Sequence, residues 1–126
     1  MSEGVKGGFD MGLLDDVGTA YRRYAAGDCV FVTEDEGDCM YLVRSGLVEI
    51  VAYGTVLDRV GPGGMFGEIA LIDGAPRTAS AVVVEDCEVA PITREGFLTL
   101  VQRNPEFAIE VMRTLARRLR GMNEGL

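Results

Sequence analysis

Short runs of residues that favour β-strands, separated by Gly, Pro or acidic turns, fill the chain from Thr19 to Thr93. The runs are rich in branched and aromatic residues, and they are Tyr21–Tyr24, Cys29–Val32, Met40–Arg44, Leu47–Val51, Val56–Val60, Ala79–Val84 and Cys87–Ile92. Ser45-Gly46, between two of them, has the composition of a hairpin turn. Many short strands with regular turns predict a closed roll or a sandwich. Pro91 has no N–H to donate, so we expect its strand to lie at an edge or to be bulged there.

The pattern changes to helical spacing after Thr93. Thr93 can cap a helix that begins at Arg94, and this helix would place Phe97, Leu98 and Val101 on its inner face. Asn104-Pro105-Glu106 is typical of a second helix start: a cap residue, a proline in the first turn and an acid favoured by the helix dipole. The apolar residues that follow recur at spacings of three and four, and they are Ala108, Val111, Met112, Leu115, Leu119 and Met122. This stripe predicts an amphipathic helix that packs on the core; a partner interface or a moving lid is the alternative.

Residues 1–18 are rich in Gly and Asp and have weak periodicity. We expect a partly ordered lead-in there, with residues 11–14 packing on the domain, and one domain over residues 19–126. No apolar run approaches the roughly 18 residues that a membrane span needs. The N-terminus also lacks the basic start and apolar stretch of a signal peptide. The sequence therefore predicts a cytoplasmic protein without a membrane segment.

Composition narrows the classes of function. The net charge of −8 disfavours non-specific attraction to nucleic acid or to anionic lipid. The chain has no histidine, which removes the commonest metal ligand and general base, together with Ser/His/Asp and Cys/His catalytic sets. Three cysteines without a CxxC spacing argue against a disulfide framework. A binding domain is therefore favoured over an enzyme.

Residues 61–79 combine glycines with two acids, Glu68 and Asp73, and one arginine, Arg77. Glycines just before Glu68 allow a backbone to approach a ligand closely. Glu68–Leu71 is long enough for one helical turn, and the free N–H groups of a first turn suit an anion. Arg77 offers a fork of donors that matches phosphate oxygens, and Glu68 could pair with it or accept hydrogen bonds from sugar hydroxyls. These residues alone predict either an anion site or, at equal odds, a surface ion pair beside a Gly-rich turn.

The segment Phe66–Leu71 followed by Arg77–Ala79 resembles the phosphate-binding cassette of cyclic-nucleotide-binding domains. These domains occur in catabolite-activator-type regulators, in regulatory subunits of cyclic-nucleotide-dependent kinases and in cyclic-nucleotide-gated channels. The spacing from Glu68 to Arg77 matches without insertion, and the similarity extends over residues 19–120 through Ala26-Gly27-Asp28, Gly37-Asp38, Ser45-Gly46, Asp86-Cys87, Phe97 and Pro105. The resemblance implies a mainly β fold: an eight-stranded antiparallel, jelly-roll-like β-roll with a short cassette helix and two C-terminal α-helices.

The resemblance also assigns roles within residues 66–79, called the cassette below. Glu68 would accept from the ribose 2′-hydroxyl, Arg77 would pair with the exocyclic oxygens of the cyclic phosphate, and the Ala70 N–H would donate to that phosphate. Thr78 would lie near the phosphate and the edge of the purine. A hydroxyl at this position favours tolerance of cGMP but does not decide between cGMP and cAMP. No catalytic residue, metal or cofactor is implied. The expected ligand-binding set is Gly67, Glu68, Ile69, Ala70, Arg77, Thr78 and Ala79.

Other positions carry further expectations. Met65 and Phe66 should pack under the cassette rather than touch ligand. Asp35 stands where the family often has Gly, so the acidic loop should depart from the family's shape. The lead-in before Tyr21 is shorter than the N-terminal helical segment of the family. The residues expected to cover the base, where the family often has a helical lid, are Arg118, Arg120 and Met122.

The favoured function is therefore a stand-alone sensor of cAMP or cGMP, whose C-terminal helices move when nucleotide binds. The alternative is an interaction module that keeps the fold without binding nucleotide and offers its last helix to an effector protein or to a second copy. DNA binding by this chain is not expected, because the charge is acidic and no helix-turn-helix follows the long helix. An enzyme is disfavoured, since nothing pairs a nucleophile with a base.

Overall fold

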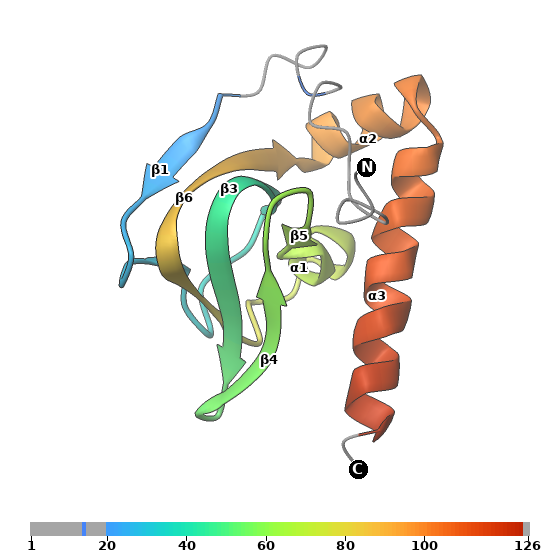
Figure 1. Cartoon of the computed structure of the whole chain (residues 1–126). Coiled ribbons are helices and arrows are strands. Elements are labelled where there is room, and N and C mark those ends of the chain that lie inside the picture. The colour runs from blue at the N-terminus through green and yellow to red at the C-terminus, as the bar shows by residue number, and fades with distance from the viewer. Residues whose placement is uncertain (1–13, 15–19, 125–126) are drawn as a thin grey trace, which may run out of the picture.

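The computed structural model describes Leu14 and residues 20–124 as one antiparallel sheet with helices on one side of it (Figure 1). The sheet has six strands in the order β1-β6-β3-β4, with β2 paired to β6 and β5 paired to β3. The strands are β1 (Arg22–Tyr24), β2 (Cys29–Phe31), β3 (Cys39–Ala52), β4 (Thr55–Val60), β5 (Met65–Phe66) and β6 (Ser80–Thr93). The helices are α1 (Glu68–Asp73), α2 (Arg94–Arg103) and α3 (Glu106–Glu124). The mainly β fold with C-terminal helices is confirmed.

Two long strands, β3 and β6, form the centre of the sheet and correct the predicted strand count. The hairpin predicted at Ser45-Gly46 is wrong, because β3 runs straight through it and pairs with β6 on both sides. The register shifts between Val43 and Ser45 and again beside Leu47, and Gly46 has a φ of +90°. A bulge thus bends one strand where a hairpin turn was expected to separate two. Ala79–Val84 and Cys87–Ile92 likewise merge into β6, so six strands replace the expected eight.

Side chains alternate along β3 between two apolar clusters. Met40 and Leu42 point to the helix side, where they pack with Leu100, Phe107 and other residues of the first cluster. Cys39, Tyr41 and Val43 point into the curved sheet and join the second cluster, which also contains Phe31 and Phe66. Period-two alternation with both faces covered explains why β3 is almost entirely apolar up to Val43. The cassette lies between the two clusters, with Phe66 in one and Leu71 in the other.

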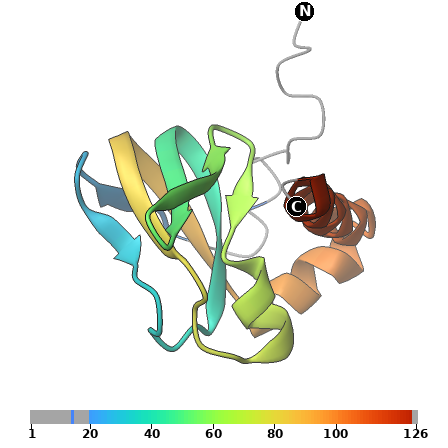
Figure 2. The same ribbon diagram turned by 90° about the horizontal axis from the view of Figure 1, so that it is seen from below.

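The helices begin where the sequence predicts. The Thr93 hydroxyl accepts from the Gly96 N–H at 3.1 Å, which caps α2, and α3 starts directly after Pro105. Their buried faces differ in part from the prediction. Leu98, Met112 and Leu119 are exposed, whereas Leu100, Phe107 and Val111 are buried. Figure 2 shows α1, α2 and α3 on the same side of the sheet. The first half of α3 packs on the core through Phe107 and Val111, and the exposed apolar residues of the helix, such as Met112 and Leu119, face away from the core.

The predicted lead-in lies outside the described residues, apart from Leu14. Leu14 is buried in the first apolar cluster, as expected for the packing of residues 11–14. Pro91 lies in β6 beyond the end of the β1 ladder, which covers Cys87–Val89, and it pairs with Tyr41 on the other side. The missing N–H of Pro91 therefore falls at an edge of the described sheet, as the sequence predicts.

Candidate phosphate and ribose site

The cassette folds as a turn, a short helix and a return loop. Gly67 has a φ of +81° directly before α1, and Gly74 has a φ of +72° directly after it. Both angles are in the left-handed region that glycine adopts without steric cost. A Cβ on Gly67 would also lie 2.9 Å from Nη1 of Arg77. The sequence therefore folds this segment so that the backbone at Gly67 approaches the arginine directly.

Arg77 is buried, with 5% of its surface exposed. Its Nη1 donates to the carbonyl of Gly67 at 2.8 Å, and its Nη2 donates to the carbonyl of Cys39 at 2.6 Å. The guanidinium carbon lies 4.0 Å from the centre of the Phe31 ring and 5.8 Å from that of Tyr41. These contacts stabilise a buried cation through backbone oxygens and aromatic faces. No carboxylate of the described residues pairs with Arg77, so its positive charge is uncompensated there, beside the start of α1.

The acidic loop before β3 holds the backbone of Arg77. The Glu34 N–H donates to the Arg77 carbonyl and the Arg77 N–H donates to the Asp35 carbonyl, both at 2.8 Å. The residue with the glycine-like angle is Glu34, whose φ is +79°. Asp35, which stands where the family often has Gly, accepts from the Val32 N–H through its carboxylate at 3.0 Å. The strained position in this loop is therefore Glu34, directly before the residue that stands where the family often has Gly.

Glu68 is buried as deeply as the core, with 1% of its surface exposed. Its partner is Arg118 of α3, 50 positions later, whose Nη1 donates to Oε2 of Glu68 at 2.5 Å. A buried carboxylate needs a compensating charge, and Arg118 supplies it. Glu68 and Arg77 therefore do not form the surface ion pair that the sequence left open. Instead, Glu68 connects the cassette to the C-terminal helix.

Asp58 of β4 completes this cluster of charges. Its carboxylate accepts from Nε of Arg118 at 2.8 Å and from Nη2 of Arg117 at 3.2 Å. Partial burial acts to raise the pKa of Asp58, but the hydrogen bonds from Arg118 and Arg117 outweigh it and lower that pKa. Burial likewise acts to lower the pKa of Arg118, and the attraction of Glu68 and Asp58 raises it. Both groups are therefore held in their charged forms.

Two buried polar atoms in this region have no hydrogen-bond partner in the described part of the chain. They are Oε1 of Glu68, an acceptor, and Nε of Arg77, a donor. Buried polar groups are paired in the great majority of cases, so each unpaired atom calls for an explanation. Glu68 and Arg77 are the two buried charged residues of the described chain. One loop-helix segment thus presents an unused acceptor and an unused donor, as a site for a ligand with hydroxyl and phosphate groups would.

Comparison with known families identifies the domain that contains this segment. The family model described as "Cyclic nucleotide-binding domain" matches residues 21–104, more than half of the chain, including the whole cassette. The chain belongs to the cyclic nucleotide-binding domain family. The family resemblance of Phe66–Ala79 is confirmed, and the chain contains a binding domain.

Relatives of this cyclic nucleotide-binding domain include regulators from bacteria and fungi. It is 41% identical over 104 residues to the cyclic AMP receptor protein of Thermus thermophilus, a match that covers 79% of this chain and 48% of that protein. It is 39% identical over 76 residues to the cAMP-dependent protein kinase regulatory subunit of Yarrowia lipolytica, covering 60% of this chain and 20% of that protein. The chain thus spans less than half the length of these two relatives.

A solved structure supports the fold directly. The crystal structure of the Thermus thermophilus catabolite activator protein superposes with a TM-score of 0.79 at 36% identity, over 96% of this chain and 60% of that one. The strands, the cassette helix and the C-terminal helices therefore belong to a common architecture.

The residues expected to bind nucleotide lie together in the domain, with different exposures. Ala70 and Ala79 are buried, whereas Thr78 is exposed, as a residue at a ligand edge would be. Ile69 is exposed on the outer face of α1. Met65 and Phe66 are buried beneath the cassette as predicted. Of the three residues expected over the base, Arg118 contacts Glu68, Arg120 is exposed, and the side chain of Met122 lies outside the described residues.

Three residues of the site were missed in the sequence. Phe31 lies under Arg77, and Asp58 holds Arg118. Gly37 presses against Arg77: a Cβ there would lie 2.6 Å from its Nε. The glycine before Asp38 was a visible signal for close approach, but nothing near Asp58 or Phe31 in the sequence indicates their partners. In the described residues, no helix is long and apolar enough to cross a membrane, and no cluster of metal-binding side chains occurs.

Proposed function

We propose that this chain is a regulatory module that reversibly binds a cyclic nucleotide, with cAMP as the first ligand to test and cGMP as the second. The observation that carries the proposal is the pair of unpartnered buried atoms, Oε1 of Glu68 and Nε of Arg77, in one cassette. The names of the relatives, a cyclic AMP receptor protein and a cAMP-dependent kinase subunit, support the choice of cAMP. The exposed Thr78 hydroxyl keeps cGMP open.

The proposed contacts follow from the chemistry of the two ends of the ligand. A ribose hydroxyl donates to Oε1 of Glu68, while Oε2 stays on Arg118. The cyclic phosphate lies at the uncompensated charge of Arg77, whose guanidinium has five donors and uses two of them on Gly67 and Cys39. Gly67 and the Ala70 N–H border the same ligand. The module binds the nucleotide unchanged and performs no reaction on it.

The proposed response is a shift in the position of α3. Glu68 is at once a ligand group and the partner of Arg118, so the ligand and α3 share one carboxylate. Binding repositions the helix only to the extent that the nucleotide binds one arrangement better than another. The coupling passes through the hydrogen bond between Arg118 of α3 and Glu68 of the cassette.

A thermal-unfolding panel tests the proposal. A ligand that binds the folded state at a concentration of 100 times its Kd stabilises it by about 2.7 kcal/mol, which raises the midpoint by roughly 10 °C in a domain of this size. We expect cAMP or cGMP to raise the midpoint with increasing concentration. The matched control is 5′-AMP, which lacks the cyclic phosphate and should produce little shift. Equal shifts with 5′-AMP, or none with either cyclic nucleotide, would contradict the proposal.

We further propose that a second copy of the chain covers α3. Ile109, Met112, Ala116 and Leu119 are all exposed and recur at spacings of three, four and three. This is the spacing of a two-helix seam, and two identical helices present it to each other symmetrically. The alternative is an interaction module that keeps the fold but does not bind nucleotide, and in which the same seam binds an effector protein.

The net charge of −8 supports a module that does not itself bind DNA. We propose a cytoplasmic location for this module.

A further inference from the structure

The guanidinium of Arg118 is divided among three acceptors. Its Nε donates to Oδ2 of Asp58 at 2.8 Å, and its Nη2 donates to the carbonyl of Met65 at 2.7 Å. Its Nη1 donates to Oε2 of Glu68 at 2.5 Å. Three different partners therefore hold the three nitrogens, and they come from β4, β5 and α1. The side chain of Arg118 is largely buried in this arrangement, with 19% of its surface exposed.

This division limits how Arg118 binds Glu68. An arginine that faces a single carboxylate favours two parallel hydrogen bonds, one to each oxygen. Here Asp58 and Met65 hold the other two nitrogens, so Arg118 reaches Glu68 through Nη1 alone. The second oxygen of Glu68, Oε1, is buried and has no partner in the described chain. The one-armed contact is thus the reason why an acceptor remains for a ligand.

We infer that Asp58 is a positioning residue for ribose recognition: by holding Nε of Arg118 it keeps the Arg118–Glu68 contact one-armed and reserves Oε1 for a ligand hydroxyl. The inference rests on the proposed function, because it assigns the free oxygen to the ribose of a cyclic nucleotide. Asp58 itself touches no ligand in this account.

The charges around Asp58 explain why one residue has this effect. Two carboxylates, Asp58 and Glu68, face two guanidiniums, Arg117 and Arg118, and Asp58 receives hydrogen bonds from both arginines. Without Asp58, Glu68 is the one carboxylate that Arg118 still contacts in the described part of the chain. The guanidinium can then turn, so that Nη2 exchanges the neutral Met65 carbonyl for the charged Oε1 of Glu68 and covers it. A ribose hydroxyl would have to displace a charge-assisted hydrogen bond before it could bind.

The test compares cAMP with 2′-deoxy-cAMP by calorimetry on the full chain and on Asp58→Ala. A hydrogen bond to a charged group gives the wild type about a tenfold preference for cAMP over the deoxy nucleotide. In Asp58→Ala we expect this ratio to fall to about two or less. The fall should come from weaker cAMP binding, with the affinity for 2′-deoxy-cAMP unchanged. A general structural defect would weaken both nucleotides together, so the ratio separates the two cases.

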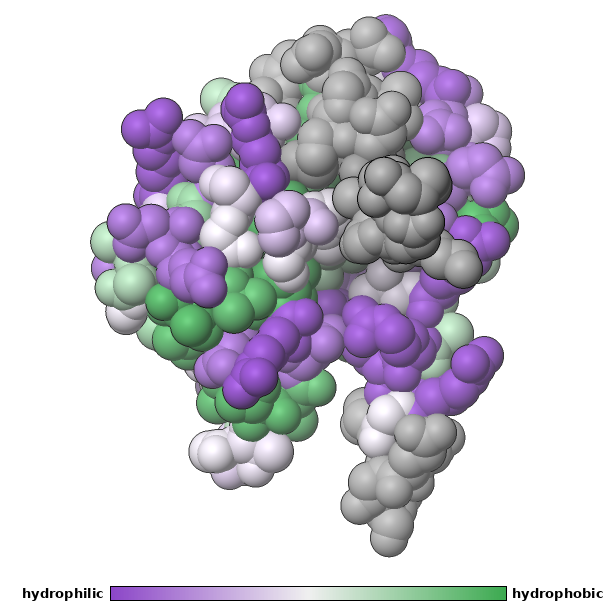
Figure 3. Space-filling view, viewed as in Figure 1, coloured by the Kyte–Doolittle hydropathy of each residue, from purple (hydrophilic) through white to green (hydrophobic). Residues whose placement is uncertain are grey.

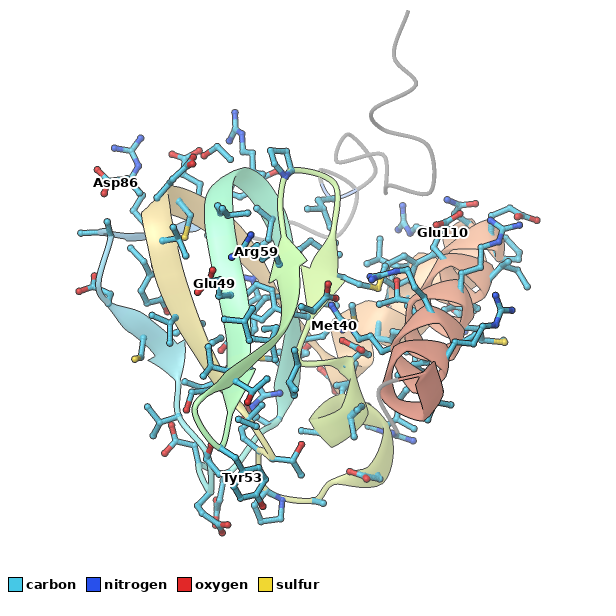
Figure 4. The ribbon with its side chains drawn as sticks, turned by 60° about the horizontal axis from the view of Figure 1, so that its bottom comes forward. Met40, Glu49, Tyr53, Arg59, Asp86 and Glu110 are labelled. Carbon is cyan, nitrogen blue, oxygen red and sulfur yellow. The ribbon has the colours of Figure 1, made fainter. Side chains whose placement is uncertain are left out.

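Two further variants control the measurement. Asp58→Asn keeps an oxygen that can accept from Nε of Arg118, so most of the preference for cAMP should return. Glu49→Gln removes a similar carboxylate from the neighbouring strand. The Glu49 carboxylate lies 2.9 Å from Nε of Arg59, and this pair is away from α3 (Figure 4). This variant should keep the wild-type ratio.

The outcomes separate this inference from the proposed function. An unchanged ratio in Asp58→Ala, or an equal loss for both nucleotides, would overturn the role of Asp58 and leave nucleotide binding in place. A wild-type chain that binds neither nucleotide would overturn the proposed function and this inference with it. A ratio that falls in Asp58→Ala and recovers in Asp58→Asn is the result that supports it.

Discussion

At the scale of single residues, the backbone around Arg77 is set by the loop before β3. The Asp35 carbonyl of this loop accepts from the Arg77 N–H, and the Glu34 N–H donates to the Arg77 carbonyl. Glu34 makes its contact with a φ of +79°, where a side chain is sterically unfavourable. The arginine is thus held by a turn that contains local strain, in the part of the molecule assigned to ligand binding.

Relief of this strain should stabilise the protein. We expect Glu34→Gly to raise the free energy of unfolding by about 0.5–1 kcal/mol, measured by urea denaturation, because glycine adopts the left-handed angle freely. The backbone N–H that donates to Arg77 is retained. The matched control is Gly27→Ala, since Gly27 has a φ of +95° and open space around it, and this change should destabilise by about 1 kcal/mol. A Glu34→Gly variant no more stable than the wild type would contradict the account.

The sequence predicted the two buried charges of the site but not all of their partners. Glu68 and Arg77 stand nine positions apart in a Gly-rich segment, so local spacing and resemblance identify both. Arg118 and Asp58 are 60 positions apart in the chain. Their contact depends on how α3 lies against β4, which no local pattern encodes. The left-handed angle of Glu34 was not predicted from the sequence either, because the turn that contains it is bonded to Arg77, more than 40 positions later.

At the scale of elements, α3 is attached in two different ways. Its first half contributes Phe107, Val111 and, in part, Leu115 to the first apolar cluster. Beyond Leu115, no described side chain of α3 joins either apolar cluster. The attachments there are the hydrogen bonds of Arg117 and Arg118 to Asp58, Glu68 and Met65. The end of the helix is therefore held by charges, which makes its attachment sensitive to pH and to the ligand.

Acidification tests this attachment. The pKa of Asp58 is lowered in the folded protein, below the ordinary value of about 3.9 that it regains on unfolding. The interaction of Asp58 with Arg117 and Arg118 therefore contributes its full stability above about pH 4. This stability is lost as the pH falls through the pKa that Asp58 has in the folded protein. We expect wild type to be more stable than Asp58→Asn in urea denaturation near neutral pH, with the difference shrinking below about pH 4. A difference that stays constant down to pH 2.5 would contradict this reading.

The elements also show where periodicity failed as a predictor. Both halves of β3 read as separate strands because Ser45-Gly46 is common in hairpins, yet long-range pairing with β6 makes that turn a bulge. The α3 stripe identified a helix correctly, but Met112 and Leu119 do not face the core. Apolar residues at helical spacing thus identify the helix, but the pattern does not say which of them pack on the core.

At the scale of the whole molecule, two of the regions with exposed apolar side chains bear on possible partners. One is the α3 seam of Ile109, Met112, Ala116 and Leu119. The other is the β3–β4 hairpin, where Tyr53, Val56 and Leu57 are exposed and hydrophobic side chains gather on the surface (Figure 3). Exposed apolar patches of this kind mark interaction sites. The seam supports the proposed pairing with a second copy.

Light scattering after size-exclusion chromatography tests the pairing. We expect the wild type to be a dimer at micromolar concentration and the variant Met112→Glu with Leu119→Glu to be a monomer, because two like charges would face each other across the seam. Both residues are already exposed, so the variant should keep its circular-dichroism spectrum. A control, Leu57→Glu on the hairpin, should stay dimeric. A wild type that remains monomeric at high concentration would contradict the second-copy proposal.

The central claim is that a cyclic nucleotide binds at Glu68 and Arg77. Calorimetric titration of cAMP into nucleotide-stripped protein, with the wild type and Arg77→Gln side by side, tests it most directly. The account predicts saturable binding of one nucleotide per chain in the wild type. It predicts an affinity at least about thirtyfold weaker in Arg77→Gln, because the phosphate loses its charged partner. Equal affinity in the two proteins, or no saturable heat with cAMP or cGMP in the wild type, would contradict it.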